Sequence, residues 1–108
     1  MDRTYTGHRI YKQRSIVLVT DKEGDEPYEL DPGPSLAIMN HSPTGFEWGY
    51  GGSGPAQLAL ALLLHEGVEA DEAINLHRRF KGDVVAKLGG GWTLRGLTIQ
   101  GWIARHRS

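Results

Sequence analysis

The stretch SPTGFEWGYGGSGPAQLALALLL, residues 42–64, decides the fold of this chain. It passes from a turn through a short aromatic segment into a glycine-dense loop, and then into a run with almost no polar residue. Because nearly every residue from 56 to 64 is apolar, we expect a helix that is buried on most sides. This helix is the predicted hub of the core.

The start and end of this helix carry sequence signals of their own. Pro55 fits the first helical position, where its missing N–H costs nothing. Gln57 then has the position of a capping-box residue that reaches back to the helix N-terminus, and Ser53 is a candidate cap. Gly67 predicts the end of the helix.

The remaining elements complete an α+β fold: N-terminal antiparallel strands, the glycine loop and buried helix, a second amphipathic helix, a tryptophan segment and a short C-terminal helix. The predicted strands cover 5–11, 16–20, 28–30, 36–39 and 46–50, with a hairpin across 12–15. The second helix covers 70–80 and has Ala73, Ile74, His77 and Phe80 on one face. After the break at Gly89–Gly91, residues 92–94 are extended and the last helix runs toward Arg105.

Length and composition bound the class of protein. One domain over residues 1–108 is expected, since single cores typically carry about 100–200 residues. The net charge of −1 lacks the strongly basic balance of a dedicated duplex-binding protein. The chain has no cysteine, which removes disulfides and thiolate sites and favours a cytoplasmic location. No apolar run reaches the ~20 residues that span a bilayer, so no membrane partner is expected.

The charges are unevenly distributed along the chain. Acidic residues gather between Asp21 and Asp31 among glycines and prolines, which is typical of an exposed, solvated loop. Three basic residues, Arg78, Arg79 and Lys81, lie on the second predicted helix. They form either a solvated face or a contact surface for phosphates or an acidic partner.

The glycine loop matches the pattern G-x-G-x-x-G at Gly49, Gly51 and Gly54. Such a pattern before a helix is a ready anion site, but a second helix follows here in place of a parallel strand. No lysine follows the glycines, so a Walker motif is absent. Packing is the first interpretation, with phosphate or nucleotide binding and an exposed protein-contact loop as alternatives.

No catalytic or metal constellation stands out. Glu47 lies between two aromatic residues that would raise the pKa of its carboxyl by desolvation, yet a surface glutamate is the commoner case. The five histidines have no close ligand spacing of the kind that zinc sites show.

Three groups of residues carry a resemblance: the block 42–63; Ala73, Phe80, Val84 and Val85 with the Trp92-x-Leu94 element; and the opening Tyr5-x-Gly7-x-Arg9. In these places the chain resembles a family of small bacterial, phage and plasmid proteins known only as a domain of unknown function. The resemblance covers most of the chain. It implies no activity or cofactor, but the family's association with mobile elements implies an accessory or host-interaction role.

We therefore expect a non-enzymatic binding module, an accessory protein of a phage or plasmid that interacts with a host protein, as a monomer or homodimer. The alternative is a binder of a small anionic ligand, phosphate or nucleotide, at Gly49–Gly54, and a third hypothesis is a small enzyme that uses Glu47. A nucleic acid is the less expected partner, and no cofactor, metal or catalytic residue is predicted. The candidate ligand contacts are Glu47, Tyr50, Gly51, Gly52, Ser53, Gly54 and Gln57, and the candidate partner or phosphate contacts are Arg78, Arg79 and Lys81.

Overall fold

The computed structural model describes residues 3–10 and 14–107. Two compact units make up the chain. Residues 1–30 and 90–108 form the sheet unit, and residues 31–89 form the helical unit. The single domain over 1–108 stays a prediction, and the two units are described in turn.

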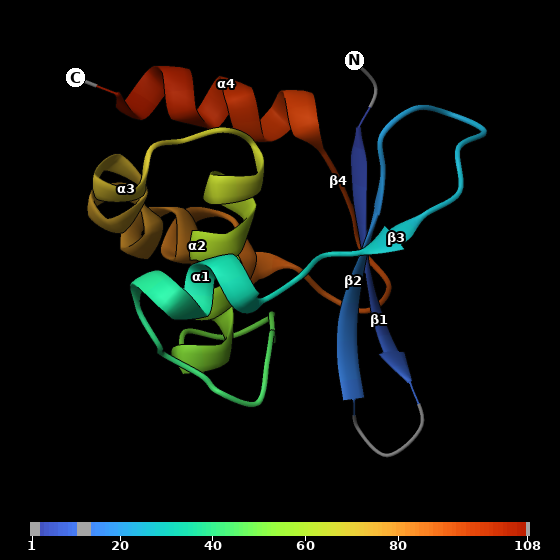
Figure 1. The fold of residues 1–108 in the computed structure, drawn as a ribbon, viewed down its shortest axis with the longest axis horizontal. Helices are drawn as coiled ribbons and strands as arrows, with labels where there is room; N and C mark the ends of the chain where they lie inside the picture. Colours follow the sequence, from blue (N-terminus) through green and yellow to red (C-terminus); the bar gives the residue numbers. More distant parts are fainter. Residues whose placement is uncertain (1–2, 11–13, 108) are drawn as a thin grey trace. The chain divides into compact units, whose positions relative to one another are not determined.

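The sheet unit contains a four-stranded antiparallel sheet, and the predicted α+β class is confirmed. The strands are β1 (Thr4–Ile10), β2 (Arg14–Thr20), β3 (Tyr28–Glu29) and β4 (Thr93–Arg95), in the spatial order β3-β2-β1-β4. Figure 1 shows β1 and β2 as the long pair, the predicted hairpin, with Tyr5 opposite Val19 and Gly7 opposite Val17. Of the predicted turn at 12–15, residues 12 and 13 lie outside the described residues, and residues 14 and 15 belong to β2.

One face of this sheet is buried, because buried residues alternate along each long strand. Tyr5, Val17 and Val19 have no exposed surface, and Leu94 of β4 lies opposite Tyr5. The predicted C-terminal helix is confirmed as α4 (Gly96–His106), which buries Ile99, Trp102 and Ile103.

The helical unit is built around the predicted buried helix, α2 (Ser53–His65). Each residue from 54 to 63 is buried, as expected for a helix with no polar face. The second predicted helix is α3 (Ala70–Asp83), and it buries Ala73, His77 and Phe80. A short 3-10 helix, η2 (Val85–Lys87), follows it.

The predicted strand at 36–39 is wrong, because these residues belong largely to helix α1 (Gly33–Ile38). Pro34 lies in the first turn, where proline favours a helix. The Asp31 carboxylate accepts a hydrogen bond from the Gly33 N–H at 2.8 Å. These start signals outweigh the apolar run that suggested a strand.

The predicted strand at 46–50 is also wrong, because this segment is irregular. Gly49 has φ +87°, a conformation outside the strand region. Phe46 and Trp48 are buried, whereas Tyr50 is exposed. Alternation along a strand would place Tyr50 on the same face as Phe46 and Trp48, and the backbone conformation of Gly49 breaks that alternation.

The acidic segment is exposed from residue 22 to residue 29, as predicted for a solvated loop. At its start, the Asp21 carboxylate accepts hydrogen bonds from the Arg3 guanidinium at 2.9 Å and the Tyr28 hydroxyl at 3.0 Å. Among the helices of residues 3–10 and 14–107, none is long and apolar enough to span a bilayer.

Candidate functional site

The glycine segment of the helical unit has a packing role at two of its three motif positions. The Gly49 N–H donates to the Val85 carbonyl at 3.1 Å, and a Cβ at Gly49 would lie 2.9 Å from the Leu88 carbonyl oxygen. A Cβ at Gly54 would lie 2.7 Å from the Cβ of Glu47. Close packing therefore requires glycine at both positions.

Gly51, the middle motif position, has no such requirement. It is exposed, and a Cβ there would meet nothing within 4 Å. Next to it, the Tyr50 ring lies against Gly52, where a Cβ would be 2.6 Å from Cε2 of Tyr50. The surface of this segment thus consists of an exposed aromatic ring beside open backbone.

The predicted capping of α2 is wrong in both parts. The helix begins at Ser53 with Gly52 as its N-cap residue, and no side chain caps it. Ser53 is exposed and lies inside the first turn, one position too late to act as the cap. Gln57 is used elsewhere.

Gln57 is the centre of a buried polar network. Its side-chain oxygen accepts hydrogen bonds from the N–H groups of His41 and Ser42 at 2.7 and 3.0 Å. Its side-chain nitrogen donates to the Ser35 hydroxyl and the Met39 carbonyl at 3.0 and 3.1 Å. These four bonds use the full capacity of an amide side chain, so Gln57 fixes residues 39–42 to α2 and has no donor or acceptor left for a ligand.

His41 and His77 form a pair that the sequence did not predict. Their Nε2 atoms lie 2.9 Å apart, and their ring centroids lie 5.0 Å apart. The two nitrogens therefore lie nearly on the line between the ring centres. This end-to-end arrangement points the N–H of one ring at the lone pair of the other, as in a hydrogen bond.

A third contact determines which nitrogens of this pair carry protons. His77 Nδ1 lies 2.7 Å from the Ile74 carbonyl oxygen, and because a carbonyl only accepts, Nδ1 carries the proton. His77 Nε2 then has the lone pair in the neutral ring, so His41 Nε2–H is the donor. Burial lowers the pKa of both rings, and the positive charges of Arg78 and Lys81 lower both further.

The end-to-end geometry differs from that of two metal ligands. Ligand lone pairs converge on a third point, about 2.0–2.1 Å from each nitrogen for zinc. Within the described part of the chain, no group of three His, Cys, Asp or Glu residues is placed to hold a metal ion.

The three basic residues of α3 do not form one patch. At about 100° per residue, Lys81 lies about 40° around α3 from His77, Arg78 lies about 100° from it and Arg79 about 160° from it. Arg79 Nε lies 3.8 Å from the Asp83 carboxylate. The charges of Arg78 and Lys81 act on both histidine rings, whereas Arg79 lies nearly opposite His77 on the helix.

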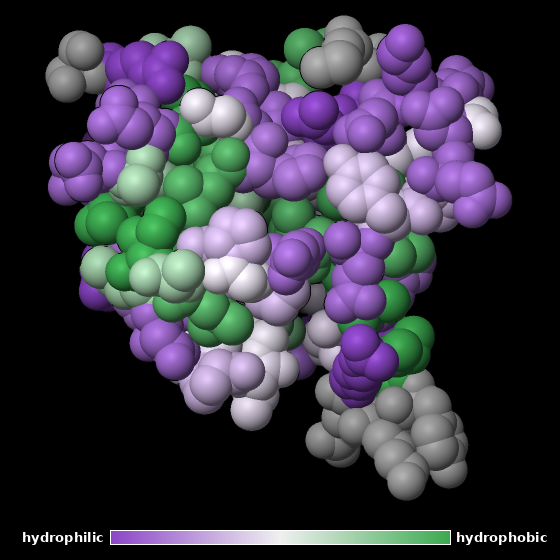
Figure 2. Space-filling view, in the orientation of Figure 1, coloured by the Kyte–Doolittle hydropathy of each residue, from purple (hydrophilic) through white to green (hydrophobic). Residues whose placement is uncertain are grey.

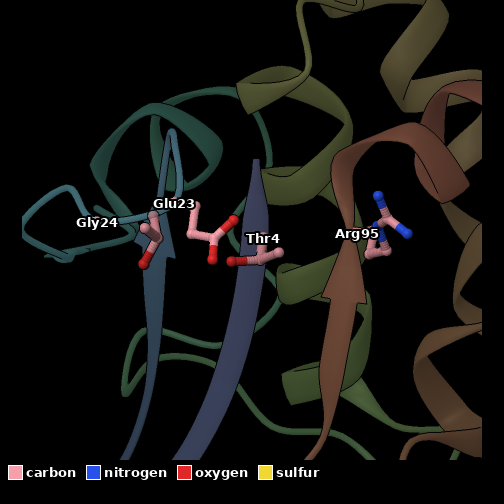
Figure 3. Close-up of a pocket in the computed structure, with 5 residues that line it drawn as sticks. Thr4, Glu23, Gly24 and Arg95 are labelled. Carbon is pink, nitrogen blue, oxygen red and sulfur yellow. The ribbon is translucent and has the colours of Figure 1, made fainter. Parts of the chain in front are cut away.

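The sheet unit has a hollow of about 450 Å³ (Figure 3). Its lining consists of Thr4, Thr20, Glu23, Gly24 and Arg95. Figure 3 shows the Glu23 carboxylate beside Thr4, whereas the Arg95 guanidinium points away from it. Ligand pockets are usually lined by hydrophobic side chains, whereas this hollow has none among its lining residues, so it is the weaker candidate.

Comparison with known proteins gives one match. No curated protein and no solved structure matches the chain. The model of a family described as a family of unknown function, DUF6166, matches residues 5–105. Because this match covers nearly the whole chain, the protein belongs to the DUF6166 family of unknown function.

Proposed function

We propose that the protein is a non-enzymatic binding module that binds a protein partner through the surface around Tyr50. One observation carries the proposal: Tyr50 is 52 % exposed, and its ring lies against Gly52. Tyrosine is enriched among the residues that dominate binding energy at interfaces. An aromatic side chain that is already positioned loses little conformational entropy on binding.

The surroundings of Tyr50 support a contact surface. The bond from Gly49 to Val85 fixes the backbone on one side of the ring, and α2 begins on the other. Gly51 leaves the backbone open to a partner. Figure 2 shows hydrophobic residues at the surface in its left part, where Figure 1 draws helices of this unit. Tyr50 adds an exposed aromatic residue to the same unit, and exposed apolar surface is typical of protein contact sites.

The alternative, a phosphate or nucleotide at Gly49–Gly54, has weaker support. The stem of Glu47 packs against Gly54 in the first turn of α2, so an acidic side chain already lies where the helix N-terminus favours negative charge. Pro55 lacks an N–H donor in the same turn. The enzyme hypothesis is weaker too, because the ring of His41 is engaged by His77.

The test compares partner capture by three forms of the full chain. The wild type, Tyr50→Ala and Tyr28→Ala are each used to capture proteins from a lysate of the host organism. Tyr28 is the matched control, since its ring is 41 % exposed in the other unit. We expect a partner that Tyr50→Ala binds about 30-fold more weakly, the effect of a hot-spot residue, and that Tyr28→Ala binds as the wild type does.

The proposal includes a cytoplasmic location and an accessory role for a phage or plasmid, so the lysate is that of the host cell. Unchanged melting temperatures show that both variants are folded. If the purified partner binds Tyr50→Ala and the wild type with equal affinity, the proposed surface is wrong.

A further inference from the structure

The second face of the sheet, opposite the buried side chains of Val17 and Val19, carries aliphatic residues. We call it the open face, because every described residue on it is half-buried or exposed. Alternation along β2 places Ile16 and Leu18 there, and Ile10 at the end of β1 is 43 % exposed. A solvated face of an antiparallel sheet is usually polar, so the sequence of β2 is that of a strand with a covering layer on each side.

One end of the open face has a row of polar side chains with an acid and a base in it. Thr20, Thr4 and Arg95 are neighbours in register across β2, β1 and β4. Glu23, from the turn that follows β2, lines the same hollow of about 450 Å³. Figure 3 shows its carboxylate beside Thr4. The row is therefore negative over β1 and β2 and positive at β4.

The acid and the base of this row do not pair with each other. In Figure 3 the Arg95 guanidinium points away from Glu23, and the Glu23 carboxylate has no ionic partner in the described part of the chain. Elsewhere on the open face, the Arg14 guanidinium lies 3.8 Å from the Glu29 carboxylate. The charge of Glu23 is thus left for a group outside the chain.

A second copy of the chain supplies a matching charge. A two-fold axis that runs parallel to the strands, between Glu23 and Arg95, turns the second copy over so that the two open faces meet. This rotation reverses the order of side chains across the sheet but keeps the same ends of the strands together. Glu23 of each copy then lies opposite Arg95 of the other, as an isologous interface requires. Sheets packed face to face keep their strand directions within about 30° of each other, which this axis allows.

We propose that the open face of the sheet binds the open face of a second copy of this chain in a two-fold dimer. The aliphatic side chains of Ile16 and Leu18 gain their covering layer there. Glu23 of each copy forms a charge-assisted pair with Arg95 of the other, which fixes the orientation of the two sheets. The open face belongs to the sheet unit and Tyr50 to the helical unit, so the dimer does not depend on the proposed protein partner.

Sedimentation equilibrium of the full chain, at about 0.15 M salt, is the first measurement. We expect a monomer–dimer equilibrium in which the apparent mass rises from 11.9 kDa toward twice this value. A wild type that stays monomeric up to about 1 mM, the limit of weak association, overturns the proposal and leaves the open face to a different partner. A tetramer or an open polymer also contradicts it, because a two-fold interface closes at the dimer.

The aliphatic part of the interface is tested by Leu18→Lys. We expect the dissociation constant of the dimer to rise about 100-fold, because the variant puts two lysines into the covered surface. Leu97→Lys is the matched control, since Leu97 is 56 % exposed on α4 and is expected to leave the constant unchanged. Melting temperatures show whether both variants are folded, and equal dissociation constants in the two would contradict the proposed interface.

The charged part is tested by Glu23→Arg and Arg95→Glu, two substitutions at exposed positions. Each variant alone places like charges opposite each other twice in the dimer, so we expect about 30-fold weaker association. An equimolar mixture restores two opposite-charge pairs in the mixed dimer. We expect its dissociation constant to lie within about threefold of the wild-type value.

Glu26→Arg is the control for net charge, because Glu26 is exposed in the same acidic segment and is not among the residues that line the hollow. We expect it to dimerise as the wild type does. A mixture of Glu23→Arg and Arg95→Glu that associates no better than either variant alone would show that these two side chains do not meet across the interface. Equal weakening by Glu23→Arg and Glu26→Arg would show an effect of net charge and would likewise overturn the pairing.

Discussion

The interiors of the two units are specified in different ways. In the helical unit, Gln57 fixes three separate backbone groups and the Ser35 hydroxyl through four hydrogen bonds. In the sheet unit, the Trp92 indole lies against Gly7, where a Cβ would be 2.2 Å from Nε1. Hydrogen bonds select particular partners, whereas close packing selects a volume. The two interiors should therefore fail under different substitutions.

The largest effect is expected for Gln57→Leu, which nearly keeps the volume but removes every hydrogen bond. The N–H groups of His41 and Ser42 and the Met39 carbonyl then lose their partner. Each unsatisfied buried group costs about 1–3 kcal/mol, so we expect the free energy of unfolding to fall by about 4 kcal/mol. Urea denaturation measures this change.

The control for that substitution is Gln100→Leu on α4, because Gln100 is an exposed glutamine in a helix. Surface substitutions usually change stability by less than about 0.5 kcal/mol. A similar small change for Gln57→Leu would mean that water replaces the network, and the contrast between the two interiors would disappear.

The packing side of the comparison is tested by Gly7→Ala. The added methyl overlaps the Trp92 ring, and overpacking of this kind typically costs about 1–3 kcal/mol. We expect a loss near 3 kcal/mol, because a large ring has to move. Gly91→Ala is the control, since a Cβ at Gly91 meets nothing within 4 Å. Thermal denaturation should give a clearly lower melting temperature for Gly7→Ala than for Gly91→Ala. Equal melting temperatures would contradict the packing role of Gly7.

Local patterns predicted most of the fold. The strand at the β-branched run 16–20 and the helix at the apolar run 56–64 were predicted correctly, because buried elements leave a direct trace in the sequence. The predicted strand at 36–39 is wrong because an apolar run of this length suits a helix as well as a strand. The decisive contact is the hydrogen bond from the Gly33 N–H to the Asp31 carboxylate, which involves a side chain. The predicted strand at 46–50 is wrong because of one backbone angle, the positive φ of Gly49.

The candidate site was harder to predict than the fold. His41 and His77 are far apart in sequence, so only the packed structure brings their rings together. A weak signal existed, since His77 falls within the apolar face of its helix and Gln57 interrupts an apolar run. Buried polar side chains nearly always have partners, but the sequence does not reveal which partners.

Two substitutions distinguish the closely packed position of the glycine motif, Gly49, from its open position, Gly51. Gly49→Ala forces a methyl into a backbone with φ +87° and within 2.9 Å of the Leu88 carbonyl, so we expect a loss of about 2 kcal/mol. Gly51→Ala meets no neighbour and should change stability by less than about 0.5 kcal/mol. Urea denaturation of both variants is the measurement, and equal losses would show that the whole motif has a structural role.

The smallest and most specific effect is expected from pH. Burial lowers the pKa of His41 and His77 in the folded protein, whereas unfolded histidine titrates near its usual value of about 6.5. The unfolded chain therefore binds more protons below that pH. The stabilising contribution of the neutral pair is fully present above about pH 7 and is lost as the pH falls, by at most about 1.4 kcal/mol per pH unit for each proton.

Unfolding free energies between about pH 7.5 and pH 5 test this sign. Carboxylates titrate over part of the same range, but their contribution is common to wild type and variants and disappears in the difference. His41→Ala removes one histidine of the pair and should flatten the slope relative to the wild type. Equal slopes in the two proteins would mean that the pair is not neutral when folded, because a group that binds the same number of protons in both states adds no pH dependence.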